Sequence, residues 1–219
     1  MNYRTMRPQV ALLAFAAAPF VFHHLPSIAG GTAGDWIDLL TPFATVGAAG
    51  AALIALRAPP AAVAIGLVGA LLYADGHGIH LAANSIRHEH PAGGAESRAH
   101  FWDERWGHIE WHSGWIVLAA AIALGEGLAR RPRGLRPASP SLAAATIVLL
   151  GFTLFTSGVE GGTWWLVLAV TVVFAGSAVR APRPLLATLA GAFVLASLLM
   201  GVWAIWHRGM PHFSELGWI

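Results

Sequence analysis

The sequence predicts an all-α membrane protein: one bundle of seven transmembrane helices, with the N-terminus in the cytoplasm and the C-terminus outside. Three observations lead to this prediction, namely the composition, the number of long apolar segments and the placement of arginine. Of the 219 residues, 56% are hydrophobic and 11% are charged, and the mean hydropathy is +0.61. Soluble domains are about 45–50% apolar and about 25% charged. The composition therefore excludes a soluble globular domain.

Seven segments are long and apolar enough, or nearly so, to cross a bilayer. A helix needs about 20 mostly apolar residues to span about 30 Å of hydrocarbon. In chain order the segments are Pro8–Pro26, Trp36–Leu56, Pro60–Ala83, His108–Leu128, Ser141–Ser157, Thr163–Val179 and Pro184–Trp206. Proline lies at most of the joints, where helices must stop. The seven segments use nearly the whole chain, so we expect a single integral membrane domain over residues 1–219.

Arginine placement predicts the orientation. Nine of the thirteen basic residues lie before the first segment or between segments two and three, four and five, or six and seven: Arg4, Arg7, Arg57, Arg130, Arg131, Arg133, Arg136, Arg180 and Arg183. Cytoplasmic loops carry an excess of Lys and Arg, so this side is the cytoplasmic one. Arginine is used to the exclusion of lysine, and alanine and glycine are abundant, which indicates a GC-rich bacterial genome. We therefore expect a multi-pass protein of the inner (plasma) membrane.

Two residue types are absent, and each absence excludes some chemistry. Without cysteine, the chain has no disulfide, thiolate zinc site, iron–sulfur cluster or Cys nucleophile. Without lysine, it has no Schiff base. The isoelectric point is near 9.9, but in an apolar chain of this kind it does not predict a nucleic-acid partner. The expected partner is the lipid bilayer, and the sequence carries no signal of the oligomeric state.

The polar residues gather on the predicted outer side. With the topology above, all eleven histidines, all ten tryptophans and ten of the eleven acidic residues fall there, Glu126 being the exception. A purely structural aromatic belt would decorate both interfaces. We therefore expect the chemistry on the periplasmic or extracellular side.

Two histidine stripes form the densest polar pattern. On the third segment the spacing is 4, 3 and 4: Tyr73, His77, His80 and Asn84. On the fourth it is 4 and 4: Glu104, His108 and His112. Residues at these spacings share one face of a helix. A single outer loop joins the two segments, so their helices are antiparallel and we expect the stripes to converge.

Imidazole and carboxylate groups together indicate a transition-metal site. These are the ligands that zinc, iron and copper take in a thiol-free protein. The predicted ligands are His77, His80, Glu104, His108, His112 and, from the last segment, His207. The predicted catalytic residues are Asp103 and Glu110, as general bases or as acceptors for an imidazole N–H. His23 and His24 end the first segment, either as ligands or as interface anchors. Haem held by one histidine from each helix is a variant, and a hydrogen-bonded cluster that locks the helices is the structural alternative.

Three functions are compatible with such a site, and whether the protein is an enzyme stays open. The leading hypothesis is a metal-dependent hydrolase that cleaves an amide or ester in an amphipathic, lipid-like substrate. The second is an iron, copper or haem redox enzyme acting on oxygen or a quinone, which the large number of ligands favours. The third is a metal-handling or accessory subunit without catalytic activity.

Overall fold

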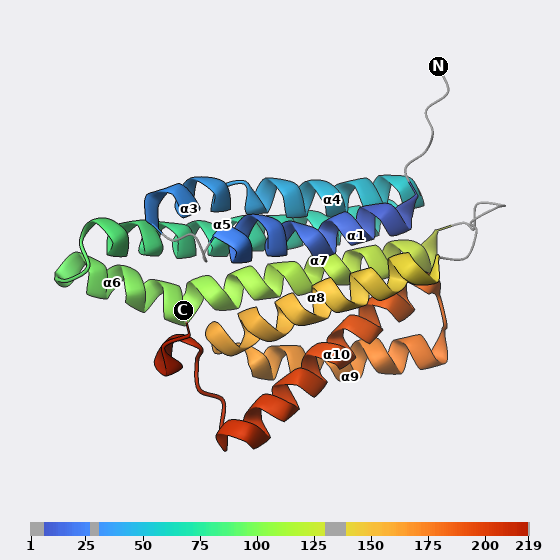
Figure 1. Cartoon of the computed structure of the whole chain (residues 1–219). Coiled ribbons are helices and arrows are strands. Elements are labelled where there is room, and N and C mark those ends of the chain that lie inside the picture. Colours follow the sequence, from blue (N-terminus) through green and yellow to red (C-terminus); the bar gives the residue numbers. More distant parts are fainter. Residues whose placement is uncertain (1–6, 27–30, 130–138, 219) are drawn as a thin grey trace.

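The computed structural model describes residues 7–26, 31–129 and 139–218, and this part of the chain contains helices and no strand (Figure 1). The helices are α1 (Pro8–Pro19), α3 (Gly31–Asp38), α4 (Thr41–Leu56), α5 (Pro60–Glu89), α6 (Gly94–Trp102), α7 (His108–Leu128), α8 (Pro140–Glu160), α9 (Trp164–Arg180) and α10 (Pro184–His207). Two π-helical turns, η1 (Phe20–His24) and η2 (Asp103–Gly107), and a short 3₁₀ turn, η3 (Ser214–Leu216), complete the list. The all-α prediction is confirmed.

Within residues 7–26, 31–129 and 139–218, four helical stretches are long and apolar enough to cross a membrane: Gly31–Leu56, which joins α3 and α4, Pro60–Glu89, Pro140–Glu160 and Pro184–His207. α9 is apolar but shorter. α7 also runs along the bundle (Figure 1), but the polar side chains of His108, Glu110 and His112 lower the hydropathy of its first turns. The chain is thus a helical membrane protein, while the count of seven spans stays a prediction.

Proline fixes where most of the long helices begin. It occupies the first or second position of α1, α4, α5, α8 and α10. Proline is favoured there because the first N–H groups of a helix lack intrahelical partners and its φ angle already suits the helix. Three predicted segment starts, at Pro8, Pro60 and Pro184, coincide with helix starts.

Glycine brings α5 and α7 into close contact. A Cβ atom on Gly76 would overlap the backbone nitrogen of Trp111, and one on Gly114 would overlap the backbone nitrogen of Tyr73. Small residues let helix backbones approach closely in membrane proteins. As a result, the two histidine stripes face each other at short range. Gly78, in contrast, faces open space.

The two ends of the bundle differ in chemistry. Figure 1 shows the start of α1 and the α4–α5 and α9–α10 joints at one end, and the α5–α6 joint, the α8–α9 turn and the end of α10 at the other. Arg57 and Arg183 lie at the first end, and the buried histidines lie toward the second. Between them the core is apolar, with Phe15, Leu118 and Phe193 among its buried side chains.

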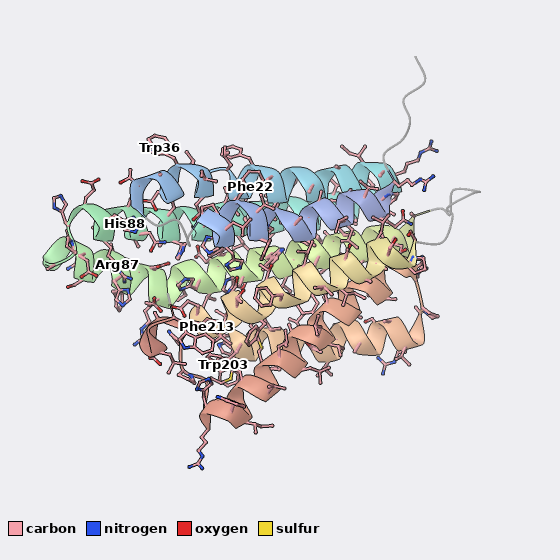
Figure 2. The ribbon with its side chains drawn as sticks, in the orientation of Figure 1. Phe22, Trp36, Arg87, His88, Trp203 and Phe213 are labelled. Carbon is pink, nitrogen blue, oxygen red and sulfur yellow. The ribbon has the colours of Figure 1, made fainter. Side chains whose placement is uncertain are left out.

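The chain after α10 folds back onto the α8–α9 turn. The backbone N–H groups of Phe213 and Ser214 donate to Glu160 Oε2 at 2.7 and 3.2 Å, and the Trp203 indole donates to the Pro211 carbonyl at 3.1 Å. Figure 2 shows Trp203 and Phe213 beside each other, with ring centroids 4.7 Å apart. Glu160 thus ties the C-terminal segment to the bundle.

Candidate metal centre

Two π-helical turns supply side chains to the histidine-rich end. η1 carries His23 and His24, and η2 carries Asp103 and Glu104. A π-helical turn inserts an extra residue into a helix, so the side chains after it change face, and such turns are frequent at functional sites. Here η1 packs against α3, and η2 packs against α5, α6 and α7.

The first donor group joins α5 to the start of α7. His80 donates from Nδ1 to Asp103, whose two oxygens lie at 3.1 Å, and His108 Nε2 lies 3.9 Å from Asp103 Oδ1. One donor atom from each of His80, Asp103 and His108 lies within 4.8 Å of the others. These three side chains can therefore bind one metal ion.

Asn84 fixes the tautomer of His80. The Asn84 amide donates to His80 Nε2 at 3.0 Å, so the ring proton lies on Nδ1 and points at Asp103. A metal ion bound at Nδ1, next to Asp103, would leave the ring proton on Nε2, where it would be donated to the Asn84 carboxamide oxygen once that amide had rotated.

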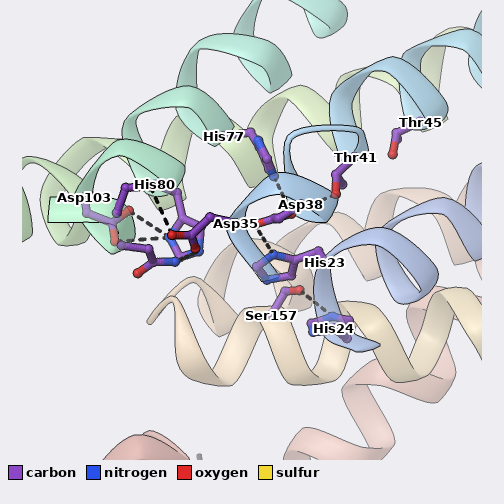
Figure 3. Close-up of polar contacts among 12 residues, drawn as sticks. His23, His24, Asp35, Asp38, Thr41, Thr45, His77, His80, Asp103 and Ser157 are labelled. Carbon is purple, nitrogen blue, oxygen red and sulfur yellow. Dashed lines mark hydrogen bonds and ion pairs between the residues drawn. The ribbon is translucent and has the colours of Figure 1, made fainter. Parts of the chain in front are cut away.

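The second donor group lies around Asp38 (Figure 3). Asp38 accepts from His23 Nδ1 and from His77 Nε2, each at 3.0 Å, and from the Thr41 hydroxyl at 2.8 Å. Donor atoms of His23, Asp38 and His80 again lie within 4.8 Å of one another. His80 is therefore common to both groups.

Trp111 separates the imidazoles from the apolar core. It is buried, and its ring centroid lies 4.8 Å from that of His23, 5.0 Å from His77, 5.1 Å from His80 and 5.2 Å from His112. An indole in this position keeps the imidazoles apart from the lipid-like interior and excludes water from one side of the centre.

The pKa values of two neighbouring carboxyl groups, those of Asp103 and Glu104, are shifted in opposite directions. Burial tends to raise the pKa of Asp103, but the hydrogen bond from His80 and the nearby charges of His80 and His108 outweigh it and lower the pKa. Burial, followed by the negative charge of Asp103, raises the pKa of Glu104. Asp103 is thus ionised at neutral pH, as a metal ligand must be.

Two imidazole nitrogens of α7 have unused donor or acceptor capacity. His112 Nδ1 hydrogen-bonds to the Thr163 hydroxyl, whereas His112 Nε2 and His108 Nδ1 are buried without a hydrogen-bond partner among the described residues. Glu104 Oε2 is the acid near His108 Nδ1, at 4.0 Å, too far for a hydrogen bond. An unpaired buried polar atom costs about 1–3 kcal/mol, so a bound ion or water at this end fits the donors that the fold presents.

The predicted site residues fall into three places. His80, Asp103 and His108 come together, with Glu104 and His112 beside them. His77 lies on the Asp38 side of the cluster. Glu110 and His207 lie elsewhere: Glu110 interacts with Asp75, and His207 packs on Trp203 with ring centroids 4.1 Å apart.

Asp38 is the residue that sequence reasoning missed, and His23 stood outside the predicted ligand set. Asp38 interrupts an apolar stretch, between Ile37 and Leu39. An acid inside a membrane segment is costly and marks a functional position by default, so this was the available signal. A single aspartate carries much less weight in the sequence than the dense histidine pattern of the third and fourth segments, so Asp38 was not among the predicted ligands.

A small polar cavity opens onto the second donor group. Its volume is about 160 Å³, and its lining includes His23, Asp38, Asp35, Asn84 and Arg87. Figure 2 places Arg87 and His88 at the same end of the molecule as Trp36.

No protein-family model, curated protein or solved structure matches this chain.

Proposed function

We propose that the chain is an integral membrane metalloprotein that binds a divalent transition-metal ion through His80, Asp103 and His108. In this proposal the bundle has seven spans, its N-terminus is cytoplasmic and the centre faces the periplasm or the cell exterior. The observation that supports it best is the convergence of three donors from α5, η2 and α7 within 4.8 Å. Two imidazoles and a carboxylate are a donor set for zinc or ferrous iron, and imidazoles also suit copper.

The reaction that we propose is the hydrolysis of an amide or ester. A bound divalent ion supplies Lewis acidity and makes water nucleophilic near neutral pH. Glu104 is the best-placed general base, because its side chain is 35% exposed and lies 4.0 Å from His108 Nδ1, next to the donor group. In this proposal Glu104 is the general base, the role that the sequence predicted for Glu110 or Asp103, and Asp103 is a metal ligand instead.

The surroundings of the centre support an amphipathic substrate. Trp36, Trp102 and Trp106 are 69%, 48% and 51% exposed and lie on the helices α3 and α6 and the turn η2, at the histidine-rich end (Figure 1). Tryptophan favours the membrane–water interface. A substrate with one apolar and one polar end would be held there with its polar end toward Glu104.

The test is hydrolysis of fluorogenic ester and amide lipids by the protein in vesicles. We expect activity that a chelator abolishes and zinc or iron restores, and that Glu104→Gln lowers by about 10²–10⁴-fold, the usual contribution of a general base. Glu89→Gln, at the exposed end of α5, is the matched control and should keep full activity. Undiminished hydrolysis by Glu104→Gln would exclude this role.

A redox function is the second candidate, and the surplus of donors favours it. His23, His77 and Asp38 lie beside the first group, whereas a catalytic zinc needs only three protein ligands. Two histidines and one carboxylate are also the ligand set of non-haem iron oxygenases. A visible spectrum separates the cases: a colourless zinc protein supports the hydrolase, and iron, copper or a Soret band supports the redox enzyme. A protein that binds metal, has no iron, copper or haem spectrum and hydrolyses none of these lipids would instead support a metal-handling subunit.

A further inference from the structure

Asp38 is surrounded in the same way as Asp103. Each is a buried aspartate with two histidines beside it: His23 and His77 for Asp38, and His80 and His108 for Asp103. The Asp38 set comes from three separate elements, since η1 carries His23, α3 carries Asp38 and α5 carries His77. Because three separate elements each contribute one residue, the set depends on the tertiary fold and not on the residue spacing within one helix.

The Asp38 set has more ionisable groups than a structural link would need. A buried ionised group is costly, and an uncharged polar pair can hold helices together at a lower cost. Asp38 already has a neutral partner in the Thr41 hydroxyl, at 2.8 Å. The two imidazoles, each at 3.0 Å from a different oxygen, are additional donors of the type that binds metals.

The Asp38 set is also the part of the cluster that the cavity reaches. His23 and Asp38 both line the cavity of about 160 Å³, and a water molecule occupies about 30 Å³ in the liquid. The cavity therefore has room for several waters and for an ion that arrives hydrated. Asp35, which accepts from His88 at 2.9 Å, and Arg87 also lie on its wall.

The two sets lie close enough to act on one substrate. The ring of His23 lies 5.4 Å from that of His80, and the ring of His77 lies 6.5 Å from it, centroid to centroid. His80 belongs to both donor groups.

We propose that His23, Asp38 and His80, whose donor atoms lie within 4.8 Å of one another, hold a second divalent transition-metal ion, which enters through the polar cavity, so that the centre is dinuclear and His80 lies between its two ions. The pairing of two ions rests on the proposed function, which supplies the first. The second position rests on this donor group, beside which His77 also donates to Asp38. Two adjacent ions can stabilise both the attacking and the leaving oxygen of a displacement.

Metal stoichiometry tests this inference. The full chain, purified in detergent without a histidine tag, is stripped with a chelator, reloaded with Co²⁺ and dialysed, and the bound cobalt is measured by elemental analysis. We expect two equivalents in the wild type, one in Asp38→Asn and one in Asp103→Asn. The matched control is Asp35→Asn, which lies on the same cavity but in neither donor group and should keep two.

The outcomes separate the two proposals. One equivalent in the wild type that Asp103→Asn loses and Asp38→Asn keeps would overturn the second position and leave the first intact. One equivalent that Asp38→Asn loses and Asp103→Asn keeps would overturn the proposed function and support the Asp38 position. No cobalt in the wild type would overturn both.

Magnetic coupling provides a readout that does not depend on one variant. Two Co²⁺ ions in one centre interact, so the paramagnetic resonance signal of the doubly loaded wild type should be weaker than twice that of Asp103→Asn. If Asp38→Asn fails to fold, His23→Gln replaces it, because the glutamine amide can still donate to Asp38 while the ligand nitrogen is gone. Two full equivalents in His23→Gln would contradict the second position.

Discussion

At the scale of single residues, the centre depends on side chains that orient the imidazoles. His80 receives a hydrogen bond from Asn84 on one nitrogen and donates to Asp103 from the other, so its ring is fixed at both ends. His112 is held in a similar way by Thr163. A partner that holds the ring sets the orientation of a metal-ligating histidine. We therefore expect Asn84 to contribute to metal binding without being a ligand itself.

We predict that Asn84→Ala weakens metal binding about 10–100-fold, the usual effect of removing a residue that orients a ligand. The measurement is the dissociation constant for zinc, from competition with a chromophoric chelator. Ser85→Ala is the control, because Ser85 lies one residue further along α5 and hydrogen-bonds to Asp35. An unchanged dissociation constant in Asn84→Ala would show that His80 needs no orientation.

At the scale of elements, glycine in the α5–α7 contact determines whether the stripes meet. The backbones touch at Gly76 and Gly114, where a Cβ atom has no room. A side chain there must push the helices apart, and this displacement separates His80 on α5 from Asp103 and His108 on η2 and α7.

We predict that Gly114→Ala lowers stability by about 1–3 kcal/mol, the usual cost of overpacking, and weakens metal binding as well. The measurements are thermal unfolding in detergent and the zinc dissociation constant. Gly78→Ala is the control in the same helix pair: it faces open space and removes a helical glycine, so its stability should be unchanged or up to about 1 kcal/mol higher. Equal behaviour of the two variants would mean that the close contact is not required.

Sequence patterns account for the helices better than for the centre. The proline positions and the apolar lengths predict where α5 and α10 begin, and the 3–4 spacing predicts that His80 and His108 share one site. These patterns do not predict that α3 and η1 contribute Asp38 and His23 to the centre. Asp38 is the last residue of α3, just before the short break at Leu39 and Leu40. The direction in which its side chain points depends on that break.

The π-helical turns limit prediction for a related reason. A stripe at 3–4 spacing assumes a regular α-helix, but η2 covers Asp103–Gly107. The extra residue brings Asp103 to the face of His80 and leaves Glu104 at the edge. The periodicity of the sequence carries no mark of this change.

At the scale of the whole molecule, the proposal depends on which side of the membrane the centre faces. Arg57 and Arg183 lie at helix joints at one end of the bundle and the buried histidines lie toward the other, and the positive-inside rule predicts that the arginine end lies in the cytoplasm. A metal ion would then load from outside.

We predict that Ser214→Cys reacts with a membrane-impermeant maleimide in intact cells, whereas Arg57→Cys reacts only after the cells are opened. Both positions are exposed, and the chain has no other cysteine, so each label reports a single site. The reverse pattern would invert the orientation and place the centre on the cytoplasmic side.

Metal binding by the buried histidines and aspartates is best tested by the metal content of His80→Ala, because His80 belongs to both donor groups. Elemental analysis would compare untagged wild type, His80→Ala and the control His90→Ala, whose side chain is exposed. We expect at least one equivalent of a transition metal in the wild type and in His90→Ala, and a loss of at least one equivalent in folded His80→Ala. Equal metal in all three proteins, or none in the wild type, would contradict it.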